Sequence, residues 1–134
     1  MKFVPCLICF LPLVWPDIGS AQTQSQLDYA VRFGSIATTS PLCGLRDDRW
    51  AADLRQAEIQ ALGSRGASSE PGLPEARQRD RIGAAMSYAE DEALENFAAA
   101  APIATCEPLA RNPDLKLADK IVAAYRSGAG MPLW

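Results

Sequence analysis

The stretch SPLCGLRDDRW, residues 40–50, decides the fold because it separates two helical patterns and places Cys43 between them. The chain has 134 residues and four cysteines, of which Cys6 and Cys9 lie in an apolar N-terminal run. Only Cys43 and Cys106 lie outside that run. Whether these two form a redox pair, ligate a metal or form a structural disulfide is therefore the main question that the sequence poses.

A structural disulfide between Cys43 and Cys106 is the simplest answer for a protein in an oxidising compartment. We expect both cysteines in loops at helix ends, where a bond does not bend a helix. Closing so long a loop stabilises a fold by about 4 kcal/mol in the chain-entropy model, against a total of roughly 5–15 kcal/mol. A free or intermolecular pair is the alternative. A catalytic dithiol usually has its thiols two residues apart, and a metal needs more soft ligands than two thiolates.

The N-terminal region has the pattern of an export signal. Lys2 precedes an uncharged run at residues 3–15, and the small residues Gly19 and Ala21 predict cleavage after Ala21. The run is too short to span a bilayer, which needs roughly 20 apolar residues. An uncleaved anchor and a buried strand are the alternatives. We expect a signal peptide at 1–21 and one helical domain at 22–134, located in the periplasm or secreted.

Composition excludes several classes of function. The net charge is −3 and there is no histidine. Nucleic acids and anionic membranes favour basic faces, so we expect no nucleic-acid partner, and no stable membrane insertion after signal cleavage. The lack of imidazole excludes Ser-His-Asp and Cys-His catalysis and the usual zinc, copper and haem sites. We therefore expect no metal, no cofactor and no catalytic residues. Abundant alanine and a strong bias to arginine over lysine are typical of a GC-rich bacterial genome, which favours the periplasm.

Four segments have helical periodicity. The first covers residues 26–38 and is stopped by TTSP before Pro41. The second covers 47–62 and is stopped by Gly63, and the third covers 74–100 and is stopped before Pro102. The fourth begins after an Asn112 N-cap, with Pro113 first in the helix, and ends at Gly128. The last three carry these apolar stripes: Trp50, Leu54, Ala57 and Ala61; Ile82, Met86, Ala89, Ala93 and Phe97; Leu117, Ala118, Ile121, Val122 and Tyr125.

The stretches outside these segments are interpreted as connections. Residues 63–75 are rich in Gly, Ser and Pro and predict a flexible loop, and residues 128–134 predict a loose C-terminal tail. We therefore predict an all-α fold, a small single-domain bundle of about four helices with one disulfide. Its alanine-rich stripes bury little area for each position, so the disulfide is expected to contribute much of the stability.

Acidic side chains gather in the third predicted helix at Glu90, Asp91, Glu92 and Glu95. Asp91 and Glu95 lie one turn apart and point away from the predicted core. A carboxylate hydrolase needs two acids that face each other across a cleft with one of them desolvated. We interpret these acids as a solvated face, and Asp91, Glu95 and Trp134 as a candidate interaction surface. Arginines crowd the beginning of the same helix, which suggests weak self-association.

The function predicted from these observations is that of an exported, non-catalytic binding or envelope accessory protein. Its partner, an unknown protein or a small ligand, is not identified by any motif. The alternatives are a periplasmic chaperone, because small acid-activated chaperones share this architecture, and an inhibitor that gives immunity to a toxin. A hydrolase that uses carboxylates alone is the rival from another class.

Overall fold

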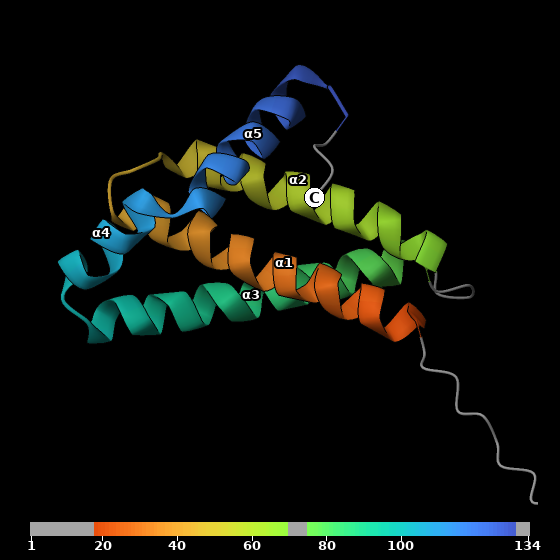
Figure 1. The fold of residues 1–134 in the computed structure, drawn as a ribbon, viewed down its shortest axis with the longest axis horizontal. Helices are drawn as coiled ribbons and strands as arrows, with labels where there is room; N and C mark the ends of the chain where they lie inside the picture. The colour runs from red at the N-terminus through yellow and green to blue at the C-terminus, as the bar shows by residue number, and fades with distance from the viewer. Residues whose placement is uncertain (1–17, 70–74, 131–134) are drawn as a thin grey trace, which may run out of the picture.

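The computed structural model describes residues 18–69 and 75–130, and over these ranges the chain forms helices and no strands. The helices are α1 (Ile18–Leu42), α2 (Asp48–Ser69), α3 (Glu75–Ala99), α4 (Pro102–Arg111) and α5 (Pro113–Ser127). The long helices α1, α2 and α3 pack on one another, α5 lies mainly on α2, and α4 lies beside α1 (Figure 1). The predicted all-α, single-domain class is confirmed, with one helix more than expected in the described part.

Helix α1 continues past the predicted stop at Thr38 and ends at Leu42, with Pro41 inside its last turn. Proline has no N–H group and removes one helical hydrogen bond. Here Thr38, Thr39 and Ser40 are buried, with 8%, 6% and 0% of their surface exposed. The packing of this turn against the core therefore outweighs the local preference of residues before proline, and the predicted boundary was wrong.

A glycine in the left-handed conformation ends α1 shortly afterwards. Gly44 has φ of 65°, its N–H donates to the carbonyl of Pro41 at 2.9 Å, and the Leu45 N–H donates to the carbonyl of Ser40 at 2.9 Å. This pair of bonds is the Schellman arrangement that closes many helices. Gly128, with φ of 68°, ends α5 in the same way, as predicted.

Helix α2 begins as expected but ends later. The Asp47 carboxylate accepts a hydrogen bond from the Trp50 N–H at 2.7 Å, which caps the helix. The helix then continues through Gly63 to Ser69, so the stop at Gly63 and the first part of the predicted loop were wrong. Isolated glycines are tolerated inside helices at a cost of about 1 kcal/mol. Residues 70–74 of that loop, the apolar run at 3–15 and Trp134 lie outside the described residues.

Helix α3 follows its prediction, and α4 is the helix that was missed. Ile82, Met86, Ala89 and Ala93 are buried along α3, with Phe97 partly buried. The next segment was expected to be a loop holding Cys106, but it forms α4, and Cys106 lies within that helix. Pro102 occupies its first turn, where proline costs no hydrogen bond.

Helix α5 confirms its predicted start. The Asn112 side chain accepts from the Asp114 N–H at 2.9 Å, with Pro113 at the first helical position. Its buried face includes Ala118, Ile121 and Val122 as expected, but Leu115 is buried in place of Leu117, which is only partly buried. The buried face therefore starts two residues earlier than predicted.

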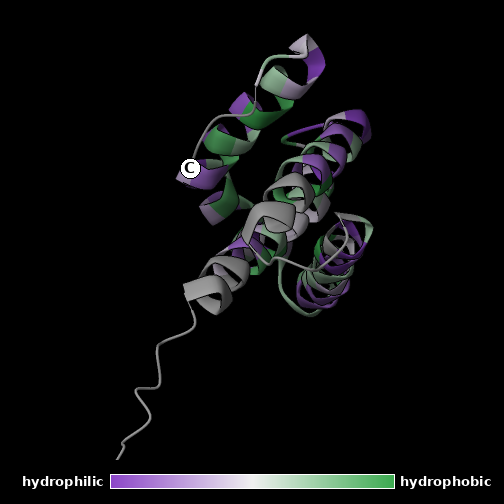
Figure 2. Cartoon of the chain, turned by 90° about the vertical axis from the view of Figure 1, so that its right-hand side faces the viewer, coloured by the Kyte–Doolittle hydropathy of each residue, from purple (hydrophilic) through white to green (hydrophobic). Residues whose placement is uncertain are grey.

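The buried side chains form two clusters. The larger joins α1, α2, α4 and α5, and the smaller joins α1, α2 and α3 around Ala30, Leu62, Ile82 and Met86. Figure 2 shows hydrophobic and hydrophilic residues interleaved along the described helices, as amphipathic packing requires. None of the described helices is both long and apolar enough to cross a bilayer.

Candidate functional site

The geometry of the candidate site starts at Gly34, where α1 crosses α3. A Cβ atom at Gly34 would lie 2.9 Å from the Met86 carbonyl oxygen and 3.3 Å from the Ala89 Cβ. Only glycine allows the two backbones to approach this closely without displacement. From this crossing the C-terminal part of α3 diverges from α1, and α4 returns beside α1 (Figure 1).

A groove of about 680 Å³ lies between α1, α3 and α4. This volume is in the range of sites that hold small ligands. Seven apolar residues line it: Val31, Ile36, Ala89, Ala93, Ala104, Pro108 and Leu109. The other lining residues are polar or charged: Arg32, Ser35, Thr39, Glu92, Asn96, Thr105, Asn112 and Asp114.

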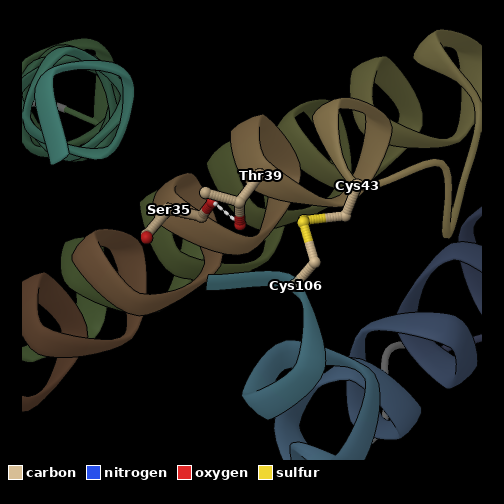
Figure 3. Close-up of a disulfide and its surroundings, with 4 residues drawn as sticks. All are labelled: Ser35, Thr39, Cys43 and Cys106. Atoms are coloured by element: carbon tan, nitrogen blue, oxygen red, sulfur yellow. Dashed lines mark hydrogen bonds between the residues drawn. A yellow bond between two sulfur atoms is a disulfide. The ribbon is translucent and has the colours of Figure 1, made fainter. Parts of the chain in front are cut away.

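The disulfide holds the α4 wall of this groove. Cys43 at the end of α1 and Cys106 in α4 are bonded, with their Cα atoms 5.3 Å apart and a sequence separation of 63. Ser35, Thr39 and Cys43 form one row along α1 that faces α4, and the Thr39 hydroxyl donates to the Ser35 carbonyl at 2.8 Å (Figure 3). The predicted pairing is confirmed, but Cys106 anchors a helix where a loop was expected.

The charged side chains of the groove are not equivalent. The Arg32 guanidinium donates to the Asp114 carboxylate at 2.9 Å and lies over the Tyr29 ring at 5.0 Å. Glu92 is exposed, and within the described part of the chain no cation pairs with it. Arg32 and Asp114 therefore compensate each other, and Glu92 supplies the net negative charge of the lining.

The predicted interaction residues Asp91 and Glu95 lie next to the groove without lining it. Both are exposed on α3, one turn apart, as their spacing indicated. Glu90, from the same acidic window, pairs with Arg55 of α2. Glu92 is the residue of this window that lines the groove. Its position could have been inferred from the sequence, because it follows Ala89 of the buried stripe by three residues, about one helical turn.

Some of the charged side chains on α3 that suggested self-association interact with residues of the same chain. Arg79 and Arg81, at the beginning of α3, both interact with other residues of the same chain. Asp53 of α2 likewise pairs within the chain, with Arg126 of α5 at 2.6 Å. Weak self-association remains a prediction.

Glu58 is a second acidic residue that the sequence reasoning missed. It lies in α2 with 0% of its surface exposed, and it interacts with other residues of the chain. The signal was its spacing of four from both Leu54 and Leu62, which are also buried. Glu58 does not line the groove, so we assign it to the packing of α2.

The part of the chain that the structure describes contains no group of three or more His, Cys, Asp or Glu side chains that could hold a metal ion. Comparison of the sequence and structure with protein-family models, curated proteins and solved structures finds no match. The groove between α1, α3 and α4 is therefore assigned as the candidate site from its own geometry.

Proposed function

We propose that this protein is exported to the periplasm, that its signal peptide is cleaved after Ala21, and that it acts in the periplasm as a non-catalytic binding protein. The ligand occupies the groove between α1, α3 and α4. The observation that carries the proposal is the groove itself, with about 680 Å³ of space lined by apolar, polar and charged side chains from α1, α3, α4 and the start of α5. Binding sites for small ligands combine an apolar lining with a few polar groups in this way.

Two features support export and a role without catalysis. A disulfide that secures a helix is typical of proteins from oxidising compartments, and the Cys43–Cys106 bond secures α4. Carboxylate catalysis requires two acids that work across a cleft, one of them desolvated. In the groove, Asp114 accepts from Arg32 at 2.9 Å and Glu92 is exposed, which favours binding over catalysis.

The test of export is the mass of the protein released from the periplasm of a bacterial host that expresses the full chain. We expect the mass of a chain that begins at Gln22, lower by two hydrogens than that of the reduced chain because of the disulfide. Recovery of the protein from the membrane fraction with residues 1–21 still attached would contradict the proposed export.

The test of the groove uses two variants of α4. Ala104 and Ala110 are both exposed, but only Ala104 lines the groove. We expect native mass spectrometry of the periplasmic protein to show a bound small molecule, which Ala104→Trp loses because the indole fills the groove. Ala110→Trp adds the same side chain elsewhere on α4 and should retain the ligand. Equal loss or equal retention in both variants would place the ligand outside the groove.

A further inference from the structure

We infer that the groove selects an organic ammonium ion with an apolar body, and that the Glu92 carboxylate is the charge partner of the ammonium group. This inference rests on the proposed function and specifies the chemical class of the ligand. Three features carry it: the apolar floor of the groove, the charge balance of its lining, and an exposed aromatic side chain one helical turn before Glu92 on α3.

The floor of the groove suits a hydrocarbon chain or ring. Ile36, Ala93 and Leu109 line the groove from three different helices, with 5%, 6% and 7% of their surface exposed. These residues are held by the core and offer a firm apolar surface. A ligand whose apolar body covers this floor removes both its own apolar surface and that of the floor from water, which favours binding.

The charge balance selects a cation over an anion. Arg32 is already engaged by Asp114 at 2.9 Å and by the Tyr29 ring, so an anionic ligand would have to compete with that carboxylate. Glu92 has no cationic partner in the described part of the chain. The exposed carboxylates of Asp91 and Glu95 on the same helix add to the negative potential, which attracts cations and repels anions.

An exposed aromatic residue lies beside this carboxylate. Tyr88 is 66% exposed and lies on α3 four residues before Glu92, which places the two on neighbouring turns of one face. Cations bind the faces of aromatic rings, and quaternary ammonium groups are recognised by this means in many proteins. A carboxylate that lines the groove, a phenol ring one turn before it on α3 and an apolar floor are elements that suit an organic ammonium ion.

The inference can be tested with three probes that share an eight-carbon chain: octylammonium, octanol and octanoate. The protein is isotope-labelled and isolated from the periplasm, and its amide resonances are followed by NMR during titration with each probe at neutral pH. We expect octylammonium to shift the amides of Ile36, Ala93 and Leu109 with an affinity about fivefold higher than octanol, the scale of one partly exposed charge pair. Octanoate should bind more weakly than octanol.

Two charge variants separate Glu92 from the general acidity of α3. Glu92→Gln should reduce the affinity for octylammonium about fivefold, to that of octanol, without changing octanol binding. Glu95→Gln removes the same charge from an exposed position that does not line the groove, and it should change the affinity less than twofold.

The outcomes distinguish this inference from the proposed function. If all three probes shift the groove amides equally, or if Glu92→Gln has no effect, the groove binds apolar ligands and the ammonium inference is wrong. If no probe shifts these amides while the periplasmic protein still carries a ligand that Ala104→Trp removes, the ligand class is wrong and the binding function stands. If no ligand is found by either experiment, both proposals fall.

Discussion

Helices α4 and α5 are consecutive and short, and they share Asn112 as their junction, but different interactions attach them to the bundle. α5 buries four side chains: Leu115, Ala118, Ile121 and Val122. α4 buries only Leu109 and is bonded to the end of α1 through Cys106. The position of α5 is thus determined by burial, whereas that of α4, which forms a wall of the groove, depends on one covalent bond.

Polar interactions reinforce the same difference. α5 forms ion pairs through Asp119 with Arg46 and through Arg126 with Asp53, and its start is capped by Asn112. α4 has Ala101 as its N-cap residue and therefore no side-chain cap. A helix with one buried side chain and no cap has little stability of its own, so the shape of the groove should depend on the disulfide.

The largest effect is expected when the disulfide is removed by the double substitution Cys43→Ala and Cys106→Ala. The free energy of unfolding should fall by about 4 kcal/mol, because the unfolded chain regains the freedom of a long loop. Hydrogen exchange should show that the amides of α4 lose protection, while those of α5 exchange only on global unfolding. Reduced wild-type protein is the control and should behave in the same way. Equal protection of α4 and α5 in the variant would contradict the comparison.

Truncation of one buried side chain in each helix should destabilise the protein more in α5 than in α4, because burial holds α5 whereas the disulfide holds α4. Ile121→Ala removes a side chain with 0% exposure and should cost about 3 kcal/mol. Leu109→Ala should cost about 2 kcal/mol or less, since α4 remains tethered. Urea unfolding of both variants, with the disulfide intact, measures the difference. A larger loss for Leu109→Ala would mean that α4 contributes more to the core than its single buried residue indicates.

Asn112→Ala should affect α5 and spare α4. The side chain of Asn112 caps α5 through the Asp114 N–H, whereas its backbone N–H donates to Leu109 of α4 at 3.0 Å. Loss of the cap should cost about 1 kcal/mol and increase hydrogen exchange in the first turn of α5. Asn112→Asp preserves the acceptor and serves as the matched control. Unchanged exchange in α5, or faster exchange confined to α4, would contradict this division.

The smallest effect is expected at the ion pair between Arg46 and Asp119. Two hydrogen bonds of 2.7 and 2.5 Å join these side chains, and Arg46→Gln should cost at most about 1 kcal/mol because both are partly exposed. Urea unfolding at low and high salt measures it, and the difference between variant and wild type should shrink at high salt. The Arg46 guanidinium also lies over the Trp50 ring, 5.7 Å from its centroid. A difference that salt does not change would show that this contact matters more than the ion pair.

The pH dependence of this pair follows from its hydrogen bonds. Hydrogen bonding to Asp119 raises the pKa of Arg46 above its ordinary value. A base with a raised pKa contributes its stabilisation at every pH below the ordinary value and loses it only as the pH rises through the raised value. The stabilisation that protonated Arg46 contributes to the free energy of unfolding should therefore stay constant through neutral pH.

The sequence predicts α5 well because its signals are local. The order Asn112, Pro113, Asp114 satisfies the first turn chemically, and Gly128 adopts the left-handed conformation that ends the helix. Each signal acts through atoms within a few residues, so it does not depend on the rest of the fold. The disulfide was predictable for a different reason, since only two cysteines lie outside the apolar N-terminal run and few alternative pairings remain.

The sequence predicts α4 and the groove poorly because their causes lie elsewhere in the chain. α4 has ten residues, two of them proline, and one buried side chain, so it is shorter than the stretch over which helical periodicity is read from a sequence. The last turn of α1 persists despite Pro41 because tertiary packing buries it. The groove arises from the divergence of α1 and α3, and neither helix encodes that angle in its own periodicity.

The absence of a side chain at Gly34 sets the distance between α1 and α3, and therefore the width of the space beside their crossing. The size of the groove can consequently be adjusted from a residue that does not line it. A methyl group at this position would act as a spacer between the two helices, so substitutions at residue 34 offer a route to engineer a wider groove while every lining residue keeps its identity.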